Sequence, residues 1–169
     1  GYSYDGRWRS VAQAMADHYG INPGDKILDV GCGKAYLLYE FTQVVPGVEV
    51  AGMDISQYAI DNAKEEMKPF LKVGHAKQLD YPDDSFDFVV SLGTLHNLYV
   101  YDLKSAVREI QRVGKEKKYI ALESYRNESE MANLLYWQLT CQSFYNTEEW
   151  EWMYLDNGYT GDFGFIFFE

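Results

Sequence analysis

Two glycines and a later aspartate are the residues whose types and spacing first suggest chemistry. Gly31 and Gly33 directly follow the β-type run Lys26–Val30, and Asp54 comes 21 residues after Gly33. Glycines after a strand let the backbone approach a ligand, and the next helix offers free N–H groups to it. A carboxylate at that distance can accept hydrogen bonds from both ribose hydroxyls. The pattern predicts a nucleotide-type ligand, although a glycine pair can be a plain turn and Asp54 could serve the helix beginning at Ser56.

The residues inside the glycine loop limit the kind of nucleotide. A dinucleotide fingerprint needs Gly or Ala where Tyr36 stands, and the phosphate-binding pattern GxxxxGK[ST] cannot be aligned here. Lys34 could reach an anion, but a solvated lysine in the first helical turn is the more ordinary interpretation. The loop therefore disfavours an NAD-dependent oxidoreductase, which stays an alternative.

Six polar or charged side chains that could contact a substrate follow two later apolar runs. They are Thr94, His96 and Asn97 after Phe86–Leu92, and Glu123, Tyr125 and Arg126 at and beyond the end of Tyr119–Glu123. By position His96 is the best general base, and Glu123 is the second catalytic candidate. Each has an ordinary interpretation too: His96 as a structural histidine, Glu123 as a capping acid and Arg126 as a surface charge.

Hydrophobic periodicity predicts the elements that position these residues. Helices are expected over 8–19, 37–45, 56–67 and 103–113, and strands over 26–30, 48–54, 70–73, 86–92 and 119–123. Strand and helix alternate, which favours a doubly wound parallel α/β sheet with helices on both faces. One domain spans 1–169, with a leading helix over 1–20 and a core over 26–124.

The two ends of the chain carry further expectations. The leading helix could cover the ligand pocket, with Tyr4, Arg7 and Trp8 reaching inward as substrate contacts, although a tryptophan such as Trp8 is more often part of the core. Residues 125–169 are expected to form two helices, on which Trp137, Trp150 and Trp152 pack against the sheet, and a closing aromatic strand. Such a strand would leave an exposed edge, and a homodimer is therefore a further expectation.

Composition excludes several classes of partner. The chain has 26 acids, 15 bases and a net charge of -11, which opposes binding to nucleic acid because phosphate contacts need Lys or Arg. No apolar run reaches the ~18 residues of a membrane span. Two cysteines, read as reduced thiols, and the absence of a secretory signal pattern favour the cytoplasm. No cluster of His, Cys and Asp has metal-ligand spacing, so no metal is expected.

Three ordered motifs resemble a known family. ILDVGCGKAYLL (27–38), VAGMDIS (50–56) and GHAKQLDYPDDSFDFVVSLGTLHNL (74–98) are similar to the motif series of class I S-adenosylmethionine-dependent methyltransferases. The nearest branch is the small-molecule enzymes related to quinone-biosynthesis methyltransferases, and the resemblance covers 26–122. It implies a Rossmann-like, mostly parallel sheet of about six to seven strands.

The resemblance also implies cofactor contacts, position by position. Those around the methionine part and the sulfonium are Asp29, Gly31, Cys32, Gly33, Ser91 and Leu92; those around the nucleoside are Asp54 at the ribose and Ile55 and Ala76 at the adenine. Ala35 replaces a family glycine, a change that should be tolerated. His75 stands where the family has an aspartate, so it could bond the adenine amino group or simply point to solvent.

The implied reaction is methyl transfer to a small-molecule acceptor by in-line displacement, with S-adenosylhomocysteine as product. The leaving group departs as a neutral thioether, so positioning supplies most of the rate. A general base matters only for a poorly acidic hydroxyl or a protonated amine. A catalytically silent domain that binds the cofactor or a partner protein is a second alternative to the enzyme.

Overall fold

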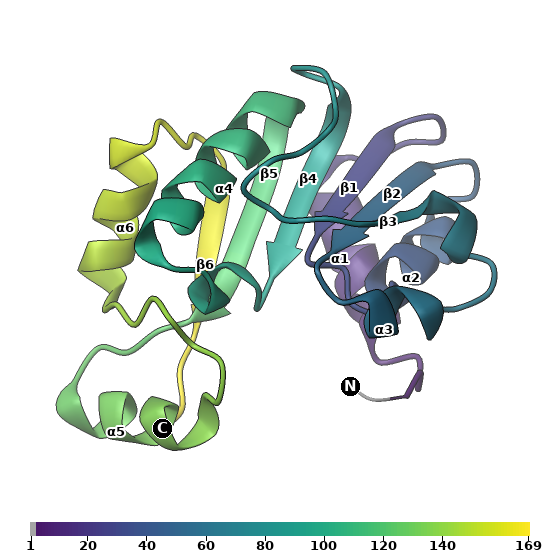
Figure 1. Cartoon of the computed structure of the whole chain (residues 1–169). Coiled ribbons are helices and arrows are strands. Elements are labelled where there is room, and N and C mark those ends of the chain that lie inside the picture. Colours follow the sequence, from purple (N-terminus) through teal and green to yellow (C-terminus); the bar gives the residue numbers. More distant parts are fainter. Residues whose placement is uncertain (1–2) are drawn as a thin grey trace.

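Within residues 3–169, six parallel strands form one sheet in the order β3-β2-β1-β4-β5-β6 (Figure 1). The structure is a computed structural model that describes residues 3–169. The strands are β1 Lys26–Val30, β2 Glu49–Asp54, β3 Leu71–Val73, β4 Phe86–Leu92, β5 Gly114–Glu123 and β6 Asp162–Ile166. The strand order reverses between β1 and β4, and a ligand crevice forms at such a switch point. The predicted doubly wound architecture is confirmed.

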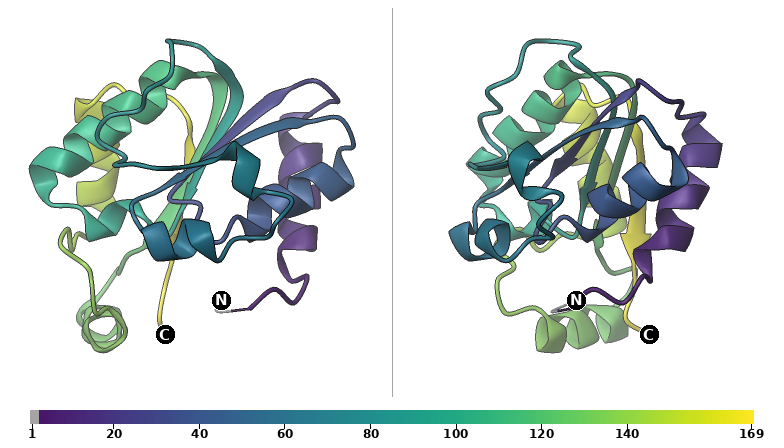
Figure 2. Two further views of the ribbon diagram at one scale, coloured as in Figure 1. Left: turned by 45° about the vertical axis from the view of Figure 1, so that its right-hand side comes forward. Right: turned by 90° about the vertical axis from the view of Figure 1, so that its right-hand side faces the viewer.

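Helices cover both faces of this sheet (Figure 2). One face carries α1 Trp8–Tyr19, α2 Tyr36–Val44 and the short α3 Gln57–Asp61; the other carries α4 Val100–Val113 and α6 Thr147–Asp156. Two single 3-10 turns are η1 Lys68–Phe70 and η2 Leu95–Asn97, and α5 Glu128–Trp137 lies beyond the carboxyl edge (Figure 1). None of the helices within residues 3–169 has the length and apolar character needed to cross a bilayer.

The core has two layers because successive strand side chains point to opposite faces. In β1, Ile27 packs toward α1 and α2, while Leu28 packs toward α4 and α6. In β4, Val89 belongs to the second layer, and its neighbours Phe88 and Val90 belong to the first. Strands buried on both faces explain the nearly continuous apolar runs in the sequence.

Three expectations about the elements were wrong in detail. The helix expected to reach Met67 ends at Asp61, where the side chain of Asn62 donates to the Tyr58 carbonyl and the chain continues as turns. Strand β5 begins at Gly114 rather than at Tyr119. Its charged first residues extend the pairing with β4 across a register shift between Phe86 and Phe88. Trp150 is buried as expected, but Trp137 and Trp152 are 70% and 57% exposed.

Candidate functional site

The loop after β1 is held tightly against its neighbours at the carboxyl edge. The N–H groups of Gly31 and Cys32 both donate to the Met53 carbonyl, at 2.7 and 3.0 Å. Gly31 has a φ of +85°, and a Cβ there would lie 2.1 Å from Oγ1 of Thr94. Glycine is therefore required at this position both by the backbone conformation and by the close approach of Thr94.

Asp54, at the end of β2, is oriented by two backbone donors. Its Oδ2 accepts the Gly33 N–H at 2.8 Å, and its Oδ1 accepts the Ser56 N–H at 2.8 Å. A carboxylate has about four lone-pair sites, so two remain for further donors. A fixed carboxylate with spare acceptor capacity beside a glycine loop suits a pair of ribose hydroxyls.

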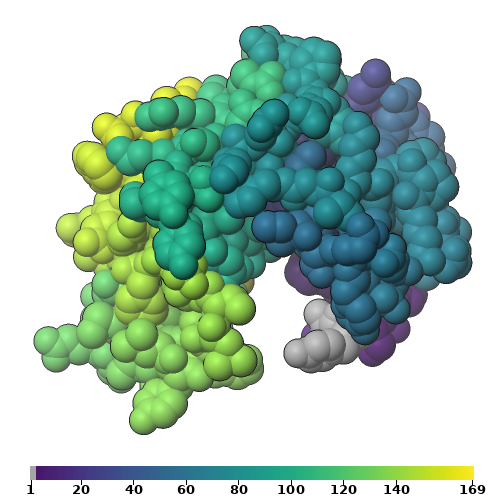
Figure 3. All heavy atoms as spheres, in the orientation of Figure 1, coloured from purple at the N-terminus to yellow at the C-terminus, as the bar shows by residue number. Residues whose placement is uncertain are grey.

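Two hollows meet at Gly31. One, of about 160 Å³, is lined by Trp8, Asp29, Gly31, Cys32, Gly33, Lys34, Tyr36, Leu37 and Leu92. The other, of about 60 Å³, is lined by Val30, Gly31, Met53, Asp54, Ile55, Gly74, His75, Ala76, Thr94 and Leu98. Both open at the carboxyl edge, where Figure 3 shows the molecule recessed between the lobe of residues 125–145 and the region of α3. Sequence reasoning missed Leu98 as a wall residue, because an apolar residue after a strand carries no distinguishing signal.

Three larger hollows lie elsewhere in residues 3–169. One, of about 750 Å³, lies between α1 and β6, one of about 630 Å³ lies at the amino edge of the sheet, and one of about 270 Å³ lies beside Glu116 and Thr160. None of them contains a residue expected to bind the cofactor or substrate. Because ligands of open α/β sheets bind outside the carboxyl ends of the strands, the pair of hollows at Gly31 is the candidate site.

Asp29 gives the larger of the two site hollows an unusually weak acid. The residue is 4% exposed, and burial, together with the charge of Asp54, raises its pKa to about 7. Burial likewise raises the pKa of the Cys32 thiol, which stays protonated at neutral pH. Near neutrality Asp29 is therefore poised to ionise beside a cation.

His75 lies at the rim of the smaller hollow and is tied to α4. Its Nδ1 accepts the Lys77 N–H at 3.2 Å, and its Nε2 lies 3.6 Å from Oδ2 of Asp102. The Lys77 ammonium also contacts Asp102, at 3.1 Å. Sequence reasoning missed Asp102, which is remote in the chain and carries no local signal.

The two catalytic candidates are brought together. Nδ1 of His96, in η2, lies 2.9 Å from Oε2 of Glu123 at the end of β5, and their side chains are 4% and 18% exposed. Burial acts to raise the pKa of Glu123, but the close approach of His96 outweighs it and lowers that pKa. The His96 carbonyl accepts N–H groups from Gln142 and Ser143, which fixes the turn.

Six other residues expected to contact the cofactor or substrate line neither hollow and have other partners. Ser91 donates to the Val30 carbonyl inside the sheet at 2.8 Å, and the guanidinium of Arg7 bonds Asp5 at 2.7 Å. The remaining pairs are Arg126 with Glu130 and Glu169, Asn97 with Thr140, Tyr125 stacked on Phe144, and Tyr4 with Glu40.

Comparisons with known proteins agree with this geometry. A family model described as a methyltransferase domain matches residues 21–158. A demethylmenaquinone methyltransferase from Symbiobacterium thermophilum is 30% identical over 145 residues, covering 79% of this chain and 57% of that protein. The chain belongs to the methyltransferase domain family. It spans roughly half the length of the curated relatives it matches.

Two solved structures show the same fold. The YcgJ protein from Bacillus subtilis has a TM-score of 0.72 at 22% identity, covering 88% of this chain and 68% of that one. The [4+2]-cyclase SpnF has a TM-score of 0.71 at 20% identity, covering 92% and 61%. These likenesses concern the fold alone.

Proposed function

We propose that this chain transfers a methyl group from S-adenosylmethionine to a small-molecule acceptor. The observation that carries the proposal is Asp54, which is fixed by the Gly33 and Ser56 N–H groups and lines the smaller of the two hollows that meet at Gly31. Membership of the methyltransferase family supports it.

The residues present fit this cofactor. Asp54 would accept the ribose hydroxyls, Ile55 and Ala76 would flank the adenine, and Asp29 would face the cationic methionine end. When bound, the cofactor supplies an electrophilic methyl group on a positively charged sulfur. Displacement leaves a neutral thioether, so we expect no metal requirement. Trp8 and Tyr36 line the larger hollow and would exclude water from it.

His96 and Glu123 would handle the proton of the acceptor. His96 would take it from a hydroxyl or an ammonium, and Glu123, 2.9 Å away, would stabilise the imidazolium that forms. Because several relatives are named demethylmenaquinone methyltransferases, a demethylated quinol is the first acceptor to test. Asn97, Tyr125 and Arg126 stay predictions as substrate contacts.

A binding domain without methyl transfer is the second candidate. The fold alone does not separate it from the enzyme, because a protein named as a [4+2]-cyclase, SpnF, has a similar fold. An NAD-dependent oxidoreductase is opposed by the side chain of Tyr36, which lines the larger hollow where the dinucleotide pattern needs a small residue. The two cysteines are free thiols, and we keep the cytoplasm as the proposed location.

Thermal unfolding with S-adenosylhomocysteine or NAD, followed by a methylation assay, tests these candidates. A ligand of the folded state at ~100 times its Kd adds ~2.7 kcal/mol, a shift of roughly 5 to 11 °C for this size. We expect that shift with S-adenosylhomocysteine alone. It should be lost in Asp54→Ala and kept in Asp61→Ala, which removes an exposed carboxylate from nearby α3.

The outcomes separate the candidates. A flat response of the wild type to S-adenosylhomocysteine contradicts the proposal, and a shift with NAD favours the oxidoreductase. With the quinol, we expect His96→Gln to lose methyl transfer about 100-fold or more while keeping its affinity for S-adenosylhomocysteine. Binding without transfer to any acceptor favours the silent domain.

A further inference from the structure

A fully buried carboxylate on α2 has no part in the site described so far. Glu40 is 0% exposed, yet it accepts hydrogen bonds from the hydroxyl of Tyr4 and from Nε of Arg9, the latter at 2.8 Å. The bond to Glu40 raises the pKa of the Tyr4 phenol. Burying a carboxylate is costly unless it is paired and hydrogen-bonded, so Glu40 strongly favours conformations in which both partners stay in place.

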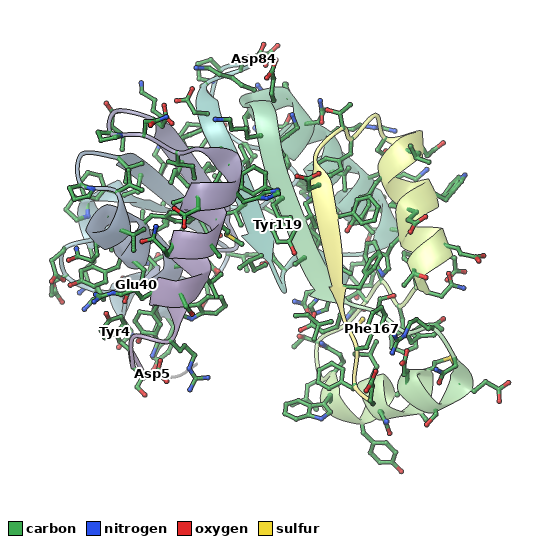
Figure 4. All side chains as sticks on the ribbon, turned by 180° about the vertical axis from the view of Figure 1, so that it is seen from behind. Tyr4, Asp5, Glu40, Asp84, Tyr119 and Phe167 are labelled. Atoms are coloured by element: carbon green, nitrogen blue, oxygen red, sulfur yellow. The ribbon has the colours of Figure 1, made fainter. Side chains whose placement is uncertain are left out.

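A second cation holds the same tyrosine from its ring face. The ammonium of Lys64, in the turn after α3, lies 4.0 Å from the ring centroid of Tyr4 and 3.9 Å from that of Tyr39. Cation–π contacts of this geometry are attractive. Tyr4 is thus fixed between α2 and the turn after α3. Figure 4 shows it beside Glu40, near the N-terminal end of α1.

The segment held in this way leads into the wall of the larger hollow. Trp8, four residues after Tyr4, begins α1 and lines that hollow together with Asp29 and Gly33. The ring of Tyr4 also contacts the ring of Tyr36, with centroids 5.6 Å apart, and Tyr36 lines the same hollow. The contacts of Glu40 therefore reach both aromatic walls of the hollow through Tyr4.

We propose that Glu40 is a positioning residue for the cofactor: it holds residues 4–9 so that Trp8 and Tyr36 close over the methionine end. This inference rests on the proposed function. Glu40 lines neither hollow itself, so its effect passes through Tyr4 and Arg9. A residue that only stabilised the packing of α1 on α2 would alter unfolding without altering the bound state.

Calorimetric titration with S-adenosylhomocysteine compares Glu40→Gln with Asp87→Asn. Asp87 also holds a cation, Lys115 at 2.7 Å, but it lies at the amino edge of the sheet, away from both site hollows. We expect Glu40→Gln to weaken binding about five- to tenfold, the lower end of coupling between linked equilibria. Asp87→Asn should bind like the wild type even where its Tm is lower.

Tryptophan emission gives a readout that a purely structural role would not move. Saturating S-adenosylhomocysteine should shift the emission of the wild type, and Trp8→Phe should abolish that shift. Glu40→Gln should show a smaller shift at saturation, because Trp8 is no longer held over the ligand. Tyr4→Phe keeps the pair of Glu40 and Arg9 and should give an intermediate result.

These results test the role of Glu40 separately from the proposed function. If the wild type binds S-adenosylhomocysteine, and Glu40→Gln shows the same affinity and the same emission shift, the role of Glu40 is overturned. The proposed function is then left intact. If Glu40→Gln does not fold, Tyr4→Phe decides by the same two readouts. A wild type that does not bind S-adenosylhomocysteine overturns the proposed function and this inference with it.

Discussion

At the scale of the residue, the ionisation of Asp29 is tied to the ligand proposed beside it. Its pKa in the folded chain is about 7, against 3.8 for an ordinary aspartate. Between these values the folded state binds more protons than the unfolded state, so the free energy of unfolding falls as pH rises toward 7. A cationic ligand favours the ionised form of Asp29. Its affinity should therefore rise with pH over the range in which the free energy of unfolding falls.

We expect the affinity for S-adenosylhomocysteine, which carries an ammonium group, to rise about tenfold from pH 6 to pH 8 and to level off above. Asp29→Asn should bind weakly with a flat profile. His96→Gln should keep the wild-type profile, which would assign the pH dependence to Asp29. Calorimetry across this pH range makes the measurement, and a flat wild-type profile would contradict the assignment.

At the scale of the element, one arginine fixes the segment that follows the smaller hollow. The guanidinium of Arg112, on α4, donates to the carbonyls of Tyr81 at 2.8 Å and Leu79 at 2.9 Å. Glu109, one turn earlier, accepts the Leu79 N–H at 2.7 Å. Since β3 and β4 are joined here without a helix, α4 determines the path of this connection and of His75 and Ala76 at its start.

Arg112→Ala should lower the free energy of unfolding by about 1–3 kcal/mol, because two carbonyls lose a charged donor at a half-exposed position. Affinity for S-adenosylhomocysteine should fall with it. Arg112→Lys should restore little of the lost stability, because one ammonium cannot reproduce the several directed hydrogen bonds of the planar guanidinium. Urea unfolding and calorimetry test this, and full recovery in the lysine variant would show that charge alone suffices.

The elements also show why the sequence predicted some features and not others. The strands, the glycine loop and Asp54 follow from local patterns, because apolar runs and the spacing after a strand are set by the backbone itself. Asp102 at His75, Glu40 at Tyr4 and Arg112 at Leu79 depend on contacts between distant segments, which no local pattern records. The pairing of His96 with Glu123 lies between these cases: parallel strands place both at one edge, but only the packed structure gives their distance.

At the scale of the whole molecule, the edge of the sheet formed by β6 exposes apolar side chains. Within residues 3–169, β6 pairs only with β5, and its apolar residues Phe163 and Ile166 are 39% and 48% exposed. Unpaired backbone groups on such a strand can template pairing with another chain. Figure 4 shows this strand from behind, with Tyr119 on the neighbouring β5.

The homodimer therefore stays a prediction, now located at β6. Light scattering should give a mass that rises toward twice that of one chain as concentration increases. Ile166→Lys, which places a charge on the exposed edge strand, should keep the monomer mass at every concentration. A wild type that is monomeric throughout would remove the prediction.

The strand order has a consequence for how the molecule assembles. Residues up to β3 can pair among themselves as β3-β2-β1. Strand β4 then adds beside β1, and each later strand adds next to the one before it, β5 on β4 and β6 on β5. The crevice at Gly31 and Thr94 lies between this first half and the strands added later. Each half supplies only one wall of the crevice, so a ligand should bind there only after the two halves have packed together. Its binding would therefore report that the fold is complete.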